Sequence, residues 1–343
     1  MRILWPVLIG LLAASYIMYR NFDAQAIAGI RWTWHSTFWI AMALVMLGVR
    51  DFAYMYRVRV LTDGDLSWRR SFNVIFLWEF ASALAPAILG GGFAFAIFII
   101  NREKINLGKS ITVVLVTSFL DGLFLALSAP IVYLVAGKEK LFSAIDPGSI
   151  SKITYGQGLL YTFWIAYAVI ILYKAIIIYA LFFKPRSVKW LLEKLFSTRL
   201  LHRWSARAEE TGTQLVIASQ GLKNKTRGYW LRAGAATFAS WSGRLLVANC
   251  IIMAFSHVLV NHFVIYSRMT VMLILMLGSP TPGSSGVAEL LFPNFLGEFI
   301  TQGLAEPLTI IWRGLSYYPY LFIGAVLLPR WLKKVFSDKN ELT

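Results

Sequence analysis

Seven of the ionisable side chains inside apolar runs of the chain are candidates for charges at membrane depth: Glu79, Asp121, Lys174, Arg244, Arg268, Glu289 and Arg313. A charge at the centre of a bilayer costs about 2.5 to 3.5 kcal/mol on insertion scales, so such residues usually face the interior of a helix bundle. The guanidinium of Arg244 suits bidentate recognition of phosphate, or it could pair with Glu289. The carboxylates could carry protons or receive a cationic head group. Equally, Glu79 and Asp121 could form fixed ion pairs with Arg313 or Arg244, while Lys174 and Arg268 are expected to snorkel toward the interface.

The composition requires lipid as the solvent for most of these residues. The chain has 343 residues, of which 58% are apolar and 15% are charged, and its mean hydropathy is +0.63. One soluble core could not hide so many apolar residues. The net charge of +16 falls mainly between the apolar runs, where it sets topology and contacts anionic head groups, so nucleic acid is the poorer explanation.

Six apolar runs are long enough to cross a bilayer, which takes about 20 residues each. They lie near 3-19, 37-56, 111-136, 158-182, 233-255 and 304-328. We expect the first run to be a retained anchor, because it has no clear signal-peptide cleavage site. Basic residues such as Arg57 and Arg59 follow the second run, and more lie between Lys184 and Arg232 and in the tail. These segments belong in the cytoplasm, which places both termini there, in a bacterial or archaeal inner membrane.

The stretch 71-100 does not read as a simple span, because the segments on both sides of it are basic and should both be cytoplasmic. Near its middle the residues have low helix propensity: Pro86, Gly90, Gly91 and Gly92. We therefore predict two half-helices that enter and return as a hairpin. One long kinked helix is the alternative.

A second interrupted stretch, 263-300, contains Pro280, Pro282, Gly283 and Gly286. If the tail is cytoplasmic, both ends of this stretch face outward, so the two hairpins would enter from opposite sides. The predicted fold is an all-α polytopic membrane protein with about six full transmembrane helices. Two oppositely oriented re-entrant hairpins complete a pseudo-inverted repeat of the kind found in secondary transporters.

The chain is predicted to form a single membrane domain, 1-343. Its segments are an N-terminal anchor and outer loop (1-36), a first half (37-136), a linker span and basic cytoplasmic segment (137-232), a second half (233-328) and a cytoplasmic tail (329-343). Within the basic segment, apolar residues recur at helical spacing over 184-204. This pattern predicts an amphipathic helix that either lies on the inner leaflet or caps the bundle.

Two breaks at membrane depth imply an interior cavity, because lipid cannot satisfy free backbone N–H and C=O groups. The half-helix N-termini after each break would favour an anionic guest. The predicted substrate-binding residues are Glu79, Pro86, Gly90, Gly91, Gly92, Asp121, Arg244, Pro280, Pro282, Gly283, Gly286, Glu289 and Arg313. His257 and His262 lie five residues apart and Cys250 is the only cysteine, so neither a metal site nor a cofactor is expected.

Three segments, GSPTPGSSGVAELLF, REKINLGKS and VTSFLDGLF, resemble the lysylphosphatidylglycerol synthase transmembrane-region family, also called the flippase-like domain family. The resemblance runs from about Arg57 to Leu328, and its most specific part is the P-x-P-G-x-x-G-x-x-E element ending at Glu289. It implies a domain that translocates lipid. In longer members a separate C-terminal domain makes the lipid; here fourteen residues, Arg330 to Thr343, follow the last apolar run, so we expect no synthase.

The expected function is translocation of a phospholipid or lipid-linked anionic substrate between leaflets. A scaffold or assembly factor that binds lipid without moving it is the alternative, and a membrane-embedded enzyme is a third class for which no nucleophile or metal cluster stands out. The expected partners are membrane lipids with anionic head groups and, in addition, a second copy of the chain.

Overall fold

The computed structural model describes residues 32–85, 92–142, 152–197, 205–256 and 260–340. Every regular element within these ranges is helical, as the predicted fold class requires. The predicted first span at 3-19 lies outside the described residues, as do Pro86, Gly90 and Gly91.

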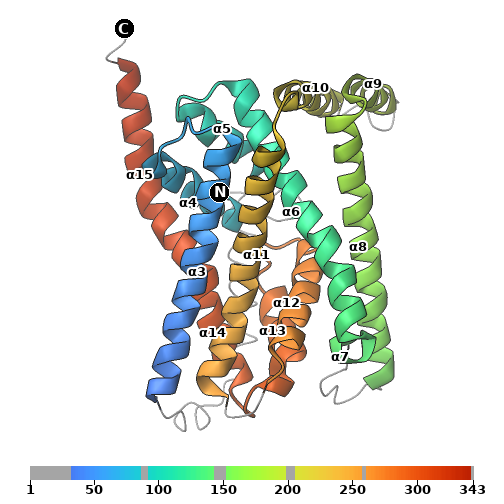
Figure 1. Cartoon of the computed structure of the whole chain (residues 1–343), viewed down its shortest axis with the longest axis vertical. Coiled ribbons are helices and arrows are strands. Elements are labelled where there is room, and N and C mark those ends of the chain that lie inside the picture. Colours follow the sequence, from blue (N-terminus) through green and yellow to red (C-terminus); the bar gives the residue numbers. More distant parts are fainter. Residues whose placement is uncertain (1–31, 86–91, 143–151, 198–204, 257–259, 341–343) are drawn as a thin grey trace.

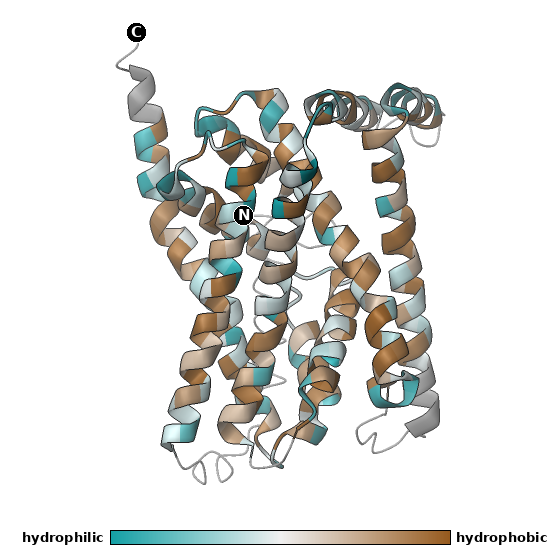
Figure 2. Cartoon of the chain, in the orientation of Figure 1, coloured by the Kyte–Doolittle hydropathy of each residue, from teal (hydrophilic) through white to brown (hydrophobic). Residues whose placement is uncertain are grey.

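Four of the helices are long and apolar enough to cross a membrane, and they coincide with the predicted runs at 37-56, 111-136, 158-182 and 233-255. They are α3 (Trp34–Leu61), α6 (Leu107–Ala136), α8 (Lys152–Phe182) and α11 (Arg227–Phe255). Side-chain caps at Thr33, Asn106 and Thr226 accept a hydrogen bond from a backbone N–H in the first turn, which fixes where α3, α6 and α11 begin. Hydrophobic residues cover most of their length (Figure 2).

Each of the two interrupted stretches forms a pair of helices packed against one another. The first pair is α4 (Trp68–Leu84) and α5 (Phe93–Arg102), and the second is α12 (His262–Leu277) and α13 (Val287–Leu296). The single kinked helix considered for 71-100 is therefore wrong. The pairs open toward opposite ends of the bundle (Figure 1), and their insertion as re-entrant hairpins in a bilayer stays a prediction.

Glycines at positive φ begin the second helix of each pair. Gly92 precedes α5 with φ of 76°, and a Cβ there would lie 2.9 Å from the backbone nitrogen of Ser82 in α4. Gly286 precedes α13 with φ of 86°. Only glycine adopts such angles without strain, so these residues let the chain reverse where the pattern predicted a break.

The predicted single span at 304-328 is wrong, because the chain crosses the bundle there as two helices. They are α14 (Ala305–Ser316) and α15 (Tyr318–Asn340), and they meet at Tyr317, whose φ of −130° is not helical. Pro319 has no N–H to donate to the carbonyl of Leu315, which explains the interruption. Together α14 and α15 run from one end of the bundle to the other (Figure 1).

Two further helices lie across one end of the bundle (Figure 1). The first, α9 (Pro185–Phe196), forms the beginning of the predicted amphipathic helix at 184-204 but ends earlier, with Ser197 as its C-cap; residues 198–204 are outside the described ranges. The second, α10 (Ser205–Leu222), was not predicted and packs against α9, α6 and α8. On α9, Val188 is buried but Leu191 is 56% exposed, so its apolar face is only partly covered by protein. Two short elements complete the fold, α7 (Lys138–Phe142) and the 3-10 helix η3 (Gly297–Phe299).

The packing of α3 against α11 positions the residues of the site. A Cβ at Gly243 of α11 would lie 2.8 Å from the Met46 carbonyl oxygen of α3, so the two backbones can approach only because this residue is glycine. The hydroxyl of Ser240 donates to the Arg50 carbonyl oxygen at 3.1 Å. Polar side chains on the facing sides of both helices are consequently held inside the bundle.

The orientation predicted from the basic segments can be tested by cysteine labelling in a Cys250→Ala background. Lys223 lies in an exposed turn after α10, and Thr301 is exposed before α14. Helix α10 lies at one end of the bundle and α14 lies toward the other (Figure 1). An impermeant maleimide on intact cells or spheroplasts should label Thr301→Cys, whereas Lys223→Cys should react only after the membrane is permeabilised. Labelling of Lys223→Cys alone in intact cells would reverse the orientation, and equal labelling of both would contradict opposite faces.

Candidate functional site

Arg50 is the centre of a polar network that joins α3, α4 and α15. Its side chain is 1% exposed, and its Nη2 lies 2.6 Å from Oε2 of Glu79, while Nη1 lies 2.9 Å from Oδ1 of Asp51. The hydroxyl of Tyr320 donates to both Asp51 carboxylate oxygens, at 2.9 and 3.0 Å, and the Tyr320 ring lies 4.4 Å from the guanidinium carbon. Glu79 therefore pairs with Arg50, and the alternative of a fixed pair with Arg313 or Arg244 is wrong.

A second network joins α3, α6 and α11 around Arg57. The guanidinium donates to Asp121 at 2.6 Å and to the hydroxyl of Thr237 at 3.1 Å. The indole N–H of Trp241 donates to the same carboxylate oxygen of Asp121 at 2.8 Å. Asp121 therefore receives donors from two helices, and the alternative of a fixed pair with Arg313 or Arg244 is wrong.

Arg57 was expected in a cytoplasmic loop after the second span, and this placement is wrong. Helix α3 continues to Leu61, so its 28 residues extend about 42 Å, and the Arg57 side chain is fully buried. The carboxylate of Asp121 neutralises it, which is what makes a buried guanidinium tolerable.

A third group of polar contacts surrounds the second break. Arg313 Nε lies 2.9 Å from Oε1 of Glu289, and both side chains are almost wholly buried. The second carboxylate oxygen of Glu289 accepts the Gly286 N–H at 2.7 Å, so Glu289 also caps α13. Arg313 donates to the Gly283 carbonyl and the Ser285 hydroxyl, each at 3.1 Å. Glu289 thus pairs with Arg313, and the alternative of a pair with Arg244 is wrong.

Tyr317 connects the two breaks. Its hydroxyl donates to the carbonyl of Ala83, in the last turn of α4, at 3.1 Å. Its ring centre lies 3.9 Å from the guanidinium carbon of Arg313. The same ring packs against Gly283, which has φ of 56°. Tyr317 therefore joins the last turn of α4 to the second break. In the second stretch, Pro282 is buried and Pro280 is exposed.

Arg244 differs from the other buried arginines. It is half-buried on α11, and its guanidinium carbon lies 5.4 Å from the centre of the Trp241 ring. Its positive charge attracts the nearby carboxylates of Asp51 and Glu79 electrostatically, without forming an ion pair with either. Within the described ranges it makes neither an ion pair nor a hydrogen bond through its side chain, so its donors are available to a ligand.

A cavity of about 850 Å³ lies between α6, α11 and α12, a volume typical of small-molecule sites. Its wall is mostly apolar, and the side chains on its rim, such as Leu127 and Phe238, are largely exposed. Its polar lining residues are Ser128, Thr237, Ser242, His262 and Tyr266. Thr237 also contacts Arg57, so this cavity borders the second network. The sequence predicted a cavity between the breaks and did not indicate this one.

Arg268 and Lys174 were predicted to snorkel toward the interface, and this prediction is wrong. Arg268 is 1% exposed and donates to the carbonyls of Lys140 and Phe295, at 2.7 and 2.6 Å, and pairs with Glu298. The Lys174 ammonium donates to the carbonyl and the hydroxyl of Ser118, each at 2.8 Å. Polar groups of neighbouring segments thus satisfy both charges inside the protein.

The sequence analysis identified both partners of the Glu289–Arg313 pair but only the acidic partner of the two pairs made by α3. Glu79, Asp121, Glu289 and Arg313 were all predicted, but Arg50 and Arg57, which hold two of them, were missed. A signal was present: Arg50 and Arg57 are seven residues apart, a spacing that puts both on one face of a helix. For Arg57 the signal was hidden because the apolar run was taken to end at residue 56, whereas Arg50 lies inside that run and was not considered among the interior charges.

Long apolar helices packed around buried ion pairs and broken helices define a polytopic helical membrane protein. The chain belongs to the family described as the lysylphosphatidylglycerol synthase TM region, whose model matches residues 3–324. It is also 22% identical over 318 residues to a UPF0104 membrane protein of Archaeoglobus fulgidus, in an alignment that covers 89% of this chain and 90% of the relative. No solved structure matches the chain. The family resemblance found in the sequence is thereby confirmed.

Replacing Glu289 by glutamine should strongly destabilise the protein, because it leaves the Arg313 guanidinium buried without its counter-charge. Loss of one partner of a buried pair typically costs about 3 to 5 kcal/mol. The readout is thermal unfolding of the purified protein in detergent. Glu193→Gln is the matched control, because Glu193 makes an exposed pair with Lys189 on α9 and should change little. Equal unfolding temperatures for the two variants would contradict a structural role for the Glu289–Arg313 pair.

Gly283→Ala should also destabilise the protein, since a Cβ at this positive φ would collide with the Tyr317 ring. Gly314→Ala is the control: no heavy atom lies within 4 Å of a Cβ built there, and the residue is helical in α14. This control should unfold at the same temperature as the wild type or higher, because alanine favours the helix. A similar loss of stability in both variants would show that Tyr317 does not hold the second break in place.

Proposed function

We propose that this protein moves a phospholipid or a lipid-linked anionic substrate between the two leaflets of the cytoplasmic membrane. The observation that carries the proposal is Arg244, a half-buried guanidinium with no carboxylate or hydrogen-bond partner among the described residues. It is set among charged groups that are already paired. An anionic head group would supply the missing counter-charge, and a phosphate accepts a guanidinium in a bidentate geometry.

The polar residues of the two networks offer a path for such a head group. Thr237, Trp241 and Arg244 follow one another at intervals of three or four residues along α11, so they share one face of the helix. Beside them lie Asp51 and Glu79, which remain partly exposed at 20% and 17%. A head group could exchange contacts along this row without entering the hydrocarbon.

The cavity between α6, α11 and α12 suits the other part of a lipid. Its wall is apolar, and it reaches the polar row at Thr237. Acyl chains in this cavity would stay in an apolar environment while the head group contacts the interior. This arrangement requires the apolar cavity and the polar row to be adjacent, and both include Thr237.

The helix pairs supply the elements that could move. We propose that α4–α5 and α12–α13 are re-entrant hairpins of an inverted repeat, entering from the cytoplasmic and the outer side respectively. In transporters of this type, access alternates as one repeat rocks against the other around a central site. Tyr317, which contacts both breaks, would then have to change partners during the cycle. No catalytic role is assigned to any residue, and we propose that the protein is not an enzyme.

A lipid-binding scaffold is the second candidate, and the fixed ion pairs favour it. Arg50, Arg57, Arg268 and Arg313 are all buried and paired, an arrangement that holds helices in one position. A rigid bundle of this kind could present a bound lipid to another protein without moving it. The two candidates share the ligand and differ in whether the lipid changes leaflet.

Reconstitution distinguishes the candidates. Proteoliposomes with fluorescent lipids in both leaflets would be treated with dithionite, which destroys the outer label, and the loss of inner label would report leaflet exchange. We expect the wild type to exchange an anionic lipid faster than empty vesicles. Arg244→Gln should exchange it at least about tenfold more slowly, because a charge-assisted hydrogen bond contributes about 1.5 to 3 kcal/mol.

Arg330→Gln is the matched control, because Arg330 is exposed in the middle of α15 and its loss should not alter exchange. Native mass spectrometry would measure lipid binding by the same variants. Saturable binding lost in Arg244→Gln, with no exchange above empty vesicles under an imposed proton or sodium gradient, would support the scaffold. Absence of both binding and exchange for anionic lipids and polyprenyl phosphates would overturn both candidates.

A further inference from the structure

A second cavity, of about 520 Å³, lies where the end of α3 meets the beginning of α11, at the end of the bundle that carries α9 and α10. In contrast to the apolar cavity, its lining is mostly polar. The lining residues are Tyr56, Arg59, Val60, Asp63, Gly64, Asn224, Lys225, Thr226, Tyr229 and Arg232. Three cations and one carboxylate therefore surround this space, so it carries a positive charge.

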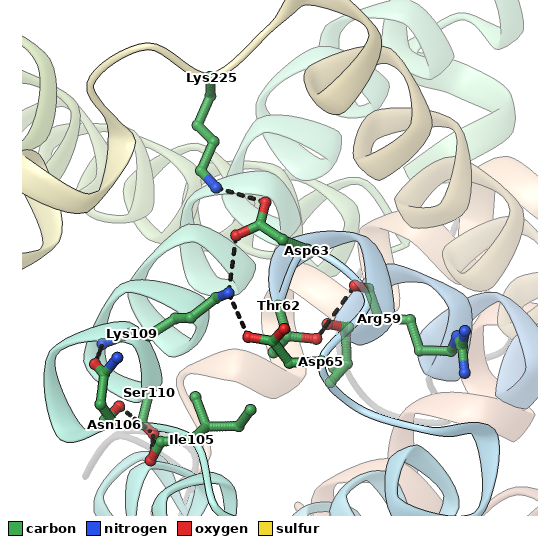
Figure 3. A network of polar contacts seen from close by, with 10 residues as sticks. Arg59, Thr62, Asp63, Asp65, Ile105, Asn106, Lys109, Ser110 and Lys225 are labelled. Atoms are coloured by element: carbon green, nitrogen blue, oxygen red, sulfur yellow. Dashed lines mark hydrogen bonds and ion pairs between the residues drawn. The ribbon is translucent and has the colours of Figure 1, made fainter.

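The single carboxylate of this cavity is already engaged. Asp63 accepts from Lys225 at 2.6 Å and from Lys109 at 2.9 Å, and Lys109 also pairs with Asp65 at 2.7 Å (Figure 3). Partial burial alone would raise the pKa of the Asp63 carboxyl, but the hydrogen bonds from Lys225 and Lys109 outweigh it, so its pKa lies below the ordinary value. Asp63 is consequently ionised at neutral pH and is occupied by the two lysines.

The two guanidiniums of the cavity have no such partner. Arg59 lies over the Trp68 ring at 4.5 Å, and in Figure 3 its guanidinium points away from the carboxylates of Asp63 and Asp65. Arg232 donates through Nε to the Gly228 carbonyl at 3.1 Å, which leaves its terminal nitrogens free. Neither arginine makes an ion pair within the described parts of the chain. Two arginines at one polar cavity provide the forked donors that phosphate oxygens accept.

We infer that this cavity binds a phosphate group, separately from the proposed translocation path. The site lies where α3 and α11 reach their polar ends, and Leu231, beside Arg232, is 73% exposed. An exposed leucine next to an arginine is typical of a helix at the level of lipid head groups. The phosphate of an anionic lipid could therefore bind from the membrane, with its chains over Leu231, and a free phosphate could bind the same donors from the aqueous side.

The test compares two doubly substituted full-length proteins in detergent. Arg59→Gln with Arg232→Gln removes both free guanidiniums. Lys223→Gln with Arg227→Gln removes the same charge from exposed residues nearby that do not line the cavity. Binding of phosphatidylglycerol would be titrated by native mass spectrometry, and binding of inorganic phosphate by isothermal titration calorimetry. Thermal unfolding without ligand would confirm that each protein is folded.

We expect phosphatidylglycerol affinity to fall at least about tenfold in the cavity variant and less than twofold in the control. If inorganic phosphate shows this pattern and the lipid does not, the site takes a soluble phosphate. If the cavity variant fails to fold, Arg59→Lys replaces it: it keeps the charge but loses the fork, and should weaken the same probe.

The inference is overturned if neither probe binds the wild type, or if both doubly substituted proteins lose affinity equally. It is likewise overturned if Arg59→Lys, used as the replacement, binds as the wild type does. Leaflet exchange is measured separately, so failure of translocation leaves this test unaffected.

Discussion

A buried guanidinium must have a counter-charge, and the first half of this bundle depends on that constraint. Helix α3 carries Arg50 and Arg57 into the interior, where an unpaired charge would be prohibitive. Glu79 of α4 and Asp121 of α6 supply the carboxylates. Because each pair joins two helices, charge neutralisation also fixes the spacing of α3, α4 and α6. The close contact of α3 with α11 at Gly243 then brings the polar face of α11 against the same residues.

The second half satisfies the same constraint in a different way. Glu289 neutralises Arg313 and also caps the helix that follows the break, so one carboxylate stabilises both a charge and a helix end. Tyr317 links this region to α4, because its hydroxyl donates a hydrogen bond to the Ala83 carbonyl. One aromatic side chain therefore contacts both the last turn of α4 and the second break, so a displacement of either helix pair would affect the other.

The bundle separates surfaces of different chemistry. An apolar cavity opens between α6, α11 and α12, a row of polar groups lies beside it in the interior, and a basic cavity lies at the end that carries α9 and α10. These three surfaces match the parts of a phospholipid: the apolar cavity suits its acyl chains, the polar row suits its head group, and the basic cavity suits its phosphate. Membership of the lysylphosphatidylglycerol synthase TM region family agrees with a membrane role. The free guanidinium of Arg244 makes lipid movement the function to test first.

The sequence by itself determined the helical class, the four long apolar helices, the positions of the two breaks and the family, because hydrophobic run length and the conformational preferences of proline and glycine are local properties. It also identified Glu79, Asp121, Glu289 and Arg313 as interior charges. Only the tertiary structure decided which charge pairs with which, since partners such as Arg57 and Asp121 are 64 residues apart and no local pattern joins them. It likewise decided that Arg244 stays without a partner in the described chain, that the crossing at 304-328 is broken at Tyr317, and that an apolar cavity lies between α6, α11 and α12, because these depend on how separate helices pack.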